Sequence, residues 1–232
     1  MIPIGDDPPP RHSFPFITLA LIAVNIVVFI YELMVPDTNT LFRSAGVTPL
    51  EFATGRDLPP AAPLNSYLIT LVTSMFLHGG FLHIGSNMLF LWIFGDNVED
   101  RLGHLRYVAF YFLCGLGASA AHIYFNLQSA IPSVGASGAI AGVLAGYLLL
   151  FPTAQIRTLL FIGFFFTVTR VPAIIMIGFW FVTQLLSGVA ALGQSEQTAG
   201  VAFWAHIGGF VVGLPLVLLL RPPARATTYS YR

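Results

Sequence analysis

The sequence has no lysine and little charge of either sign. Only 9% of its 232 residues are charged, whereas 56% are apolar and the mean hydropathy is +0.81. About a quarter of the residues in an average soluble domain are charged, so this composition excludes an ordinary soluble domain. Apolar runs of about 20 residues, enough to cross a hydrocarbon core roughly 30 Å thick, predict a polytopic membrane protein.

Cysteine and basic patches are scarce as well. The single cysteine, Cys114, lies within an apolar run, so no disulfide framework is available. The formal net charge is zero and no face is basic, so nucleic acid is not expected as a partner. Residues 1–14 lack the charged and apolar regions of a signal peptide and are too acidic for a transit peptide, so we expect a cytoplasmic N-terminal tail there.

Six apolar segments predict six transmembrane helices in one all-α membrane domain over residues 15–220, followed by a cytoplasmic C-terminal tail over residues 221–232. The segments are residues 15–35, 82–96, 107–127, 137–151, 171–192 and 201–220. With six spans, eight arginines fall on the side of the two tails and two on the other side, which places both termini in the cytoplasm. Residues 158–168 would reach only about 17 Å as a helix, so we expect them in or near the membrane interface.

The fourth segment is short and begins with a serine. Residues 137–151 would form about 22 Å of helix, which is less than the full hydrocarbon core. We therefore expect this helix to start inside the bilayer, with Ser137 below the outer surface. Irregular backbone at that depth is tolerated where it is buried in protein or lines a water-filled cavity.

Small residues recur every four positions on the fourth and sixth segments and predict that these two helices pack closely. Both helices cross in the same direction, and Ser137 and His206 lie near their N-terminal ends, so the two side chains are expected within hydrogen-bonding reach. A neighbouring base can take the proton of a serine hydroxyl, and a neutral histidine can accept it. The alternative is two independent packing residues. The glycines of the two packing faces are Gly138, Gly142, Gly209 and Gly213.

The second segment offers further polar side chains. His83 and Asn87 are four residues apart and share a helical face, from which both could donate to an oxyanion or make a structural contact. A metal site of His78, His83 and His206 is not expected, because His78 and His83 are five residues apart and no H-E-x-x-H pattern occurs. Glu99 and Arg101 lie in the tight turn after this segment, where we expect them to pair or to hold backbone.

Four sequence blocks, in this order on the expected spans, resemble the rhomboid family of intramembrane serine proteases. They are "HGGFLHIGSN", "EDR" before "LG", "GASGAIAG" and "AHIGGFVVG". The resemblance implies a six-helix bundle in which Ser137 is the nucleophile and His206 the general base and acid. It implies no cofactor.

The resemblance also implies roles for the remaining polar residues. His83 and Asn87 would line the oxyanion site together with the backbone N–H of Ser137, and His78 would help to hold water in the cavity. Glu99 and Arg101 match a structural motif of the family. The expected substrates are transmembrane segments of other proteins, which enter sideways from the lipid bilayer and unwind at the site.

Two departures from the family pattern stand out. Many members carry an aromatic residue four positions after the serine, stacked against the histidine, where this chain has Ala141. Many also have a Trp-Arg pair in the first loop, where this chain reads "SYLITLVTSMF". Something else is therefore expected to orient His206 and to anchor the loop.

Two other functions compete with the protease. One is a catalytically inactive relative that binds transmembrane segments without cutting them, and the other is a small transporter or channel that uses intramembrane histidines. A prokaryotic plasma membrane is the expected location, with an organelle membrane as the alternative. The sequence does not specify the substrate, the oligomeric state, or whether substrate enters past the fifth helix or the first loop.

Overall fold

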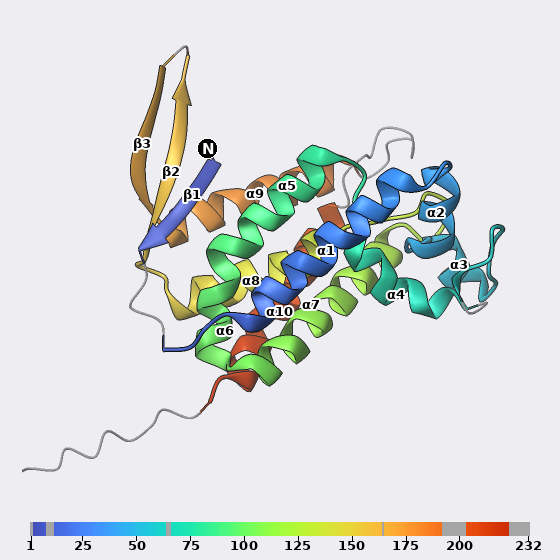
Figure 1. Ribbon diagram of the computed structural model, residues 1–232, viewed down its shortest axis with the longest axis horizontal. Coiled ribbons are helices and arrows are strands. Elements are labelled where there is room, and N and C mark those ends of the chain that lie inside the picture. The colour runs from blue at the N-terminus through green and yellow to red at the C-terminus, as the bar shows by residue number, and fades with distance from the viewer. Residues whose placement is uncertain (1, 8–11, 64–65, 164, 192–202, 223–232) are drawn as a thin grey trace, which may run out of the picture.

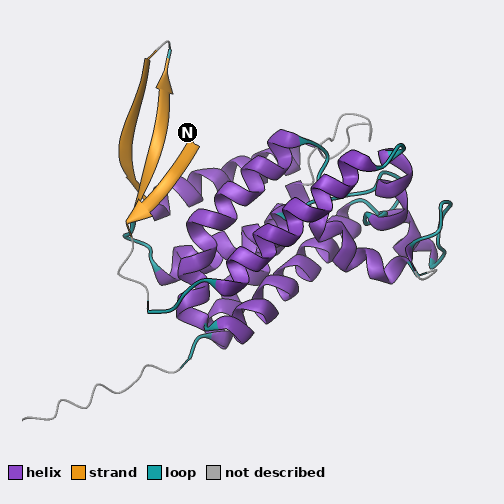
Figure 2. Ribbon diagram, in the orientation of Figure 1, coloured by secondary structure: helices purple, strands orange, loops and turns teal. Residues whose placement is uncertain are grey.

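The computed structural model describes residues 1–232 except 1, 8–11, 64–65, 164, 192–202 and 223–232 (Figure 1). Its centre is a bundle of helices, beside which stands a small β-sheet (Figure 2). Most of the expected C-terminal tail and the loop before the last helix lie outside the described residues.

The main helices follow the six expected segments to within a few residues. They are α1 (Phe16–Met34), the continuous α5 (Phe81–Phe90), η4 (Leu91–Gly95) and α6 (Asp96–Leu102), then α7 (His104–Phe125), α8 (Ser137–Leu150), α9 (Ala173–Ala191) and α10 (Phe203–Leu220). By length and composition, four described helices can cross a membrane, or five if Tyr67–Phe76 and Phe81–Leu102, bent by 79°, form one span. The apolar helix α8 has 14 residues and is shorter than these.

The first loop forms several short helices that gather around one end of the bundle (Figure 1). They are α2 (Thr38–Ala45), α3 (Pro49–Thr54), η2 (Tyr67–Ile69), α4 (Thr70–Thr73) and η3 (Ser74–Phe76). The Thr73 hydroxyl donates to the Ala45 carbonyl at 2.7 Å, which ties the end of the loop to its beginning. Val47 and Ser133 exchange backbone hydrogen bonds of 2.9 and 2.8 Å, which join the loop to the segment that precedes α8.

Helix α8 lies in the middle of the bundle and is buried on all sides. Residues 138–147 are all buried, as a short helix that is apolar around its whole circumference requires. The glycines of α8 and α10 face one another: a Cβ at Gly213 would lie 2.7 Å from the Cα and carbonyl oxygen of Gly142, and a Cβ at Gly209 would overlap the Gly138 carbonyl. Only glycine permits α8 and α10 to approach this closely.

The expectation of an all-α protein is wrong. Strands β1 (Ile2–Asp7), β2 (Gln155–Ile162) and β3 (Phe165–Pro172) form an antiparallel sheet in the order β1-β2-β3. Residues 158–168 therefore form a β-hairpin, and the expected N-terminal tail contributes its edge strand. The physical reason is that these segments are rich in β-branched and aromatic residues, which favour strands. Buried Ile156 and Thr158 alternate with exposed Arg157, as in a strand with one covered face. Gly163 supplies the left-handed backbone conformation at the turn.

Charged and polar side chains attach the sheet to the helices. Asp7 on β1 lies 3.2 Å from Arg170 and 3.8 Å from Arg157 on the two other strands. The neighbouring Asp6 accepts hydrogen bonds from the buried Tyr147 hydroxyl of α8 at 2.7 Å and from the Asn97 amide of α6 at 2.9 Å. The N-terminal strand is thus joined to the core of the bundle.

Glu99 binds backbone N–H groups, which is one of the two roles expected for it from the sequence. Its buried carboxylate accepts hydrogen bonds from the backbone N–H groups of Ile17 and Thr18 at 2.9 and 2.8 Å, and from the Thr18 hydroxyl. It thereby caps the N-terminus of α1, where a helix leaves N–H groups without partners and favours negative charge. A pair with Arg101 is not formed: the ring of His104 contacts Glu99 at 2.6 Å, and the Arg101 guanidinium lies over the Phe151 ring at 5.0 Å.

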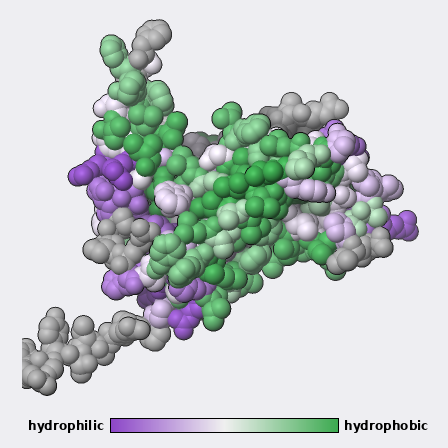
Figure 3. All heavy atoms as spheres, viewed as in Figure 1, coloured by the Kyte–Doolittle hydropathy of each residue, from purple (hydrophilic) through white to green (hydrophobic). Residues whose placement is uncertain are grey.

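The outer surface of the bundle is apolar. Large side chains of α1, among them Val27 at 65% and Met34 at 77% exposure, face outward, and Figure 3 shows apolar residues across the middle of the molecule with hydrophilic ones gathered toward its ends. An exposed apolar surface of this kind fits a lipid environment.

Candidate active site

Ser137 is placed by the irregular segment that leads into α8. The N–H of Gly135 donates to the Ser74 carbonyl at 2.8 Å, and the Val47–Ser133 backbone pair fixes the same segment two residues earlier. Gly135 has a φ of +133°, and a Cβ there would lie 2.8 Å from the His83 ring nitrogen Nε2, so both conformation and space require glycine. Ser137 then opens α8, and its backbone N–H is among the four that begin a helix without intrahelical partners.

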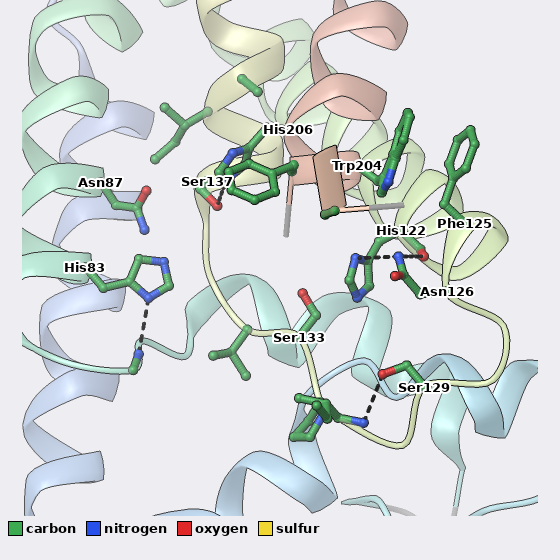
Figure 4. Close-up of a pocket in the computed structure, with 18 of the residues that line it drawn as sticks. His83, Asn87, His122, Phe125, Asn126, Ser129, Ser133, Ser137, Trp204 and His206 are labelled. Atoms are coloured by element: carbon green, nitrogen blue, oxygen red, sulfur yellow. Dashed lines mark hydrogen bonds between the residues drawn. The ribbon is translucent and has the colours of Figure 1, made fainter. Parts of the chain in front are cut away.

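The structure brings Ser137 and His206 together. Nε2 of His206 lies 2.8 Å from Oγ of Ser137, and a dashed line joins the two in Figure 4. The close seam between α8 and α10 produces this distance, because Ser137 directly precedes Gly138 and His206 lies one turn before Gly209. Serine and a histidine base at hydrogen-bonding distance form the arrangement that activates a hydroxyl nucleophile.

The second ring nitrogen of His206 has a partner that sequence reasoning missed. Nδ1 lies 2.7 Å from Oε1 of Gln184 on α9, and the ring of Trp180, one turn earlier on the same helix, has its centroid 5.8 Å from that of His206. Ala141 is fully buried and offers no ring. A polar amide in the middle of an apolar segment was the available signal, because such a side chain in a membrane helix needs a partner.

His83 and Asn87 lie on the opposite side of the pocket from α10 (Figure 4). The N–H of Gly79 donates to Nδ1 of His83 at 3.2 Å, so a neutral His83 carries its proton on Nε2, the nitrogen beside Gly135. The Asn87 side chain is buried, and its Nδ2 has no hydrogen-bond partner among the described residues. Both groups can therefore donate a hydrogen bond into the pocket.

His78 lies apart from the pocket. Its N–H donates to the carboxylate of Glu32 on α1 at 3.0 Å, and its ring packs edge-on against that of His83 with centroids 5.0 Å apart. It is not among the residues that line either described cavity. The described contacts give it a role in packing against His83, and the expected water-holding role stays a prediction.

A pocket of about 930 Å³ surrounds these side chains. Ser137, His206, His83 and Asn87 line one part of it, and the far side is closed by His122, Asn126 and the stacked rings of Phe125 and Trp204 (Figure 4). A second cavity of about 30 Å³ is lined by Ser137 and by other polar residues such as Ser74 and Ser119, and it is large enough for a single water. Among the residues that the structure describes, no group of three or more His, Cys, Asp or Glu is arranged to hold a metal ion.

Comparison with known proteins gives a consistent result. The Rhomboid domain family matches residues 65–223. The chain is 30% identical to RHOMBOID-like protein 4 of Arabidopsis thaliana over 237 residues, covering 91% of this chain and 55% of that protein. It is 34% identical to the mitochondrial Rhomboid protein 1 of Saccharomyces cerevisiae, covering 63% and 40%, and 41% identical to Rhomboid protease GluP of Bacillus subtilis, covering 34% and 15%.

The chain spans about half the length, or less, of the relatives it matches. Mitochondrial and chloroplastic proteins occur beside the bacterial one, so the expected prokaryotic plasma membrane gains no support from them. The family match covers most of the chain and includes the serine, the histidine and the glycine faces. This protein belongs to the rhomboid family.

Proposed function

We propose that the protein is an active intramembrane serine endopeptidase with a catalytic dyad of Ser137 and His206. The observation that carries the proposal is the 2.8 Å contact between Oγ and Nε2 at the edge of a large pocket. Two side-chain donors, on His83 and Asn87, face the same space. The name of one relative, a rhomboid protease, supports the same chemistry.

The proposed reaction follows the chemistry of other serine hydrolases. His206 takes the proton of Ser137 through Nε2 while Oγ attacks the carbonyl carbon of the scissile bond. The carbon–nitrogen bond then breaks, and His206 returns the proton to the leaving amine, which leaves an acyl group on Ser137. Water, activated by His206 in the same way, hydrolyses this ester and restores both residues.

The developing oxyanion requires donors that are already in place. The free Nδ2 of Asn87 is a candidate because its amide is buried without a partner among the described residues and gains one only when negative charge appears beside it. The Nε2–H of His83 and the backbone N–H of Ser137, favoured by the N-terminal end of α8, complete the set. Loss of one such donor typically costs about 100- to 1000-fold in rate.

The proposed substrates are transmembrane segments of other proteins, and the proposed topology has six spans with both termini in the cytoplasm. The 14-residue α8, enclosed by its neighbours, would start inside the bilayer and place Ser137 at the depth where a substrate helix must unwind. A helix hides its carbonyl groups in hydrogen bonds, so small or polar residues that weaken the helix should favour cleavage. A plasma membrane or an organelle membrane would both provide such substrates.

Cleavage of a model transmembrane substrate by purified protein tests the proposal. We expect Ser137→Ala and His206→Ala to abolish cleavage, and Asn87→Ala to reduce it by about 100-fold or more. A fluorophosphonate should label Ser137 in the wild type and not in His206→Ala, since only an activated hydroxyl reacts. An unlabelled wild type would favour the inactive binder, and cleavage by all variants alike would refute the dyad.

A further inference from the structure

Gln184 is a polar residue on a helix that is otherwise strongly apolar. Helix α9 carries exposed Ile174, Ile175 and Phe179 and is long and apolar enough to span a membrane. A side-chain amide on such a helix is costly unless its donors and acceptors find partners. Gln184 is partly buried, and its Oε1 contacts His206 on the neighbouring helix at 2.7 Å.

The chemistry of this contact selects one state of the imidazole. An amide oxygen can only accept a hydrogen bond, so the nitrogen that faces it, Nδ1, must carry the proton. In a neutral ring the other nitrogen, Nε2, then presents its lone pair, and this nitrogen faces Oγ of Ser137 at 2.8 Å. The opposite tautomer would carry its proton on Nε2, which would then donate to the serine oxygen and could not accept the serine proton.

We infer that Gln184 is a positioning residue that holds His206 in the proton-accepting tautomer and fixes its ring orientation. The inference rests on the proposed protease function and deepens it. Trp180, on the same face of α9 one turn earlier, packs against the ring from the side. Together the two residues of α9 do what the absent aromatic side chain at Ala141 would otherwise do.

A neutral amide differs from the aspartate of a catalytic triad in one measurable way. It orients the ring but adds no negative charge to stabilise the imidazolium that forms when His206 accepts the proton. A carboxylate at the same position would stabilise that cation and move its titration upward, since an opposite charge within about 4–6 Å favours the charged form. Among the residues that the structure describes, the other titratable groups that act on His206 are His83 on α5 and His122 on α7, and neither is changed in the variants below.

Three variants of the protein test the inference. Gln184→Met has a similar volume but no acceptor, Gln184→Glu retains an acceptor and adds charge, and Thr183→Val is the matched control. The Thr183 hydroxyl donates to the Trp180 carbonyl within α9 at 2.6 Å, whereas the described ring partners of His206 are Gln184 and Ser137. Its loss therefore alters polarity on α9 without altering the imidazole contact.

The measurements are kcat, KM and the pH profile of kcat for a model transmembrane substrate, together with the ¹⁵N chemical shifts of the His206 ring. We expect Gln184→Met to lower kcat by about 10- to 100-fold with KM within about twofold, because the loss concerns proton transfer and not binding. We expect Gln184→Glu to recover most of the activity and to move the acidic limb of the profile upward by about one pH unit. Thr183→Val should stay within about twofold of the wild type.

The ring spectra separate this inference from the function on which it rests. In the wild type we expect the neutral His206 to carry its proton on Nδ1, and in Gln184→Met a mixture of tautomers, whether or not any substrate is cut. If the wild-type protein shows no Ser137-dependent cleavage, the proposed protease function is refuted. The tautomer shift in the ring spectra would still test the positioning role of Gln184. A Gln184→Met variant with wild-type kcat and an unchanged ring spectrum would overturn the inference, as would equal loss in Met and Glu variants with no movement of the pH profile.

Discussion

The seam between α8 and α10 makes a sharp prediction, because it holds the two proposed catalytic residues at their distance. A Cβ added at Gly209 would overlap the Gly138 carbonyl, and one at Gly213 would lie 2.7 Å from Gly142 atoms, about 0.7 Å inside ordinary contact. Since main-chain atoms cannot rotate aside, Gly209→Ala must move α10 away from α8 by at least a similar amount. The Ser137–His206 distance of 2.8 Å would then exceed the roughly 3.2 Å limit for efficient proton transfer.

The size of the effect follows from this displacement. A misplacement of about 1 Å can cost about 100-fold in rate, which corresponds to about 2.7 kcal/mol of activation free energy. Overpacking typically costs a further 1–3 kcal/mol of folding stability, and the better helix propensity of alanine returns at most about 1 kcal/mol. We therefore expect Gly209→Ala to lose about 100-fold in kcat and to melt at a lower temperature.

The matched control is Gly178→Ala on α9, where an added Cβ meets no atom within 4 Å. It should leave cleavage unchanged and leave stability equal or slightly higher. Initial cleavage rates measure the first effect, and reaction of Cys114 with a thiol-reactive dye during heating measures the second, because this only cysteine is fully buried in the fold. Equal rates and equal melting for the two variants would refute the argument.

Three further predictions concern the parts of the molecule that surround the bundle core. Glu99→Gln should lower the free energy of unfolding by about 3 kcal/mol, because the α1 N–H groups lose a charged acceptor, and the Cys114 melting assay would show this. Tyr147→Phe removes the 2.7 Å hydrogen bond to Asp6 and should lower the free energy of unfolding by about 1.5–3 kcal/mol. Amide hydrogen exchange in β1 should become faster, and unchanged exchange would contradict this prediction. Phe166 at the tip of the hairpin is 73% exposed. If the hairpin lies at the membrane interface, a spin label attached at Phe166→Cys should be accessible to oxygen rather than to a water-soluble nickel chelate.

Helix positions were predictable because hydrophobic length is a strong signal. Each of the six apolar segments contains a helix, and the short α8 is rich in glycine and alanine and buried on every side. The seam between Gly138 and Gly209 was predictable for the same reason, since a four-residue repeat of small residues marks a face that approaches another helix. The Ser137–His206 contact was predictable from the seam and from the similar depth expected for the two residues.

The sheet could not be recognised from the same signals. Residues 158–168 are almost uniformly apolar, and an apolar run of this length does not distinguish a buried helix from a strand. The evidence for a strand lies in its pairing with residues 2–7, which is a contact between the two ends of a long stretch of chain. Composition indicates such a contact only weakly, and the acidic Asp6 and Asp7, which form it, looked like ordinary residues of a polar tail.

The orientation of His206 shows a different kind of limit. The absence of an aromatic residue at Ala141 indicated that another group must hold the imidazole, but the direction in which α9 presents Gln184 depends on the rotation of one helix against another. No periodicity encodes that rotation.

The contact nevertheless has a consequence for substrate entry. Helix α9 lies on one side of the pocket, and a displacement of more than about 0.5 Å would lengthen the 2.7 Å bond to Gln184 beyond normal hydrogen-bonding distance. If substrate entered past α9, the proton-accepting tautomer of His206 would be lost during entry and regained only after α9 returned, whereas entry past the first loop would leave it intact. The ¹⁵N ring spectrum of His206 with a bound, uncleaved transmembrane peptide in Ser137→Ala therefore tests whether α9 is displaced in the complex: a lasting change would indicate displaced α9, and an unchanged spectrum would indicate that α9 is in place once the peptide is bound.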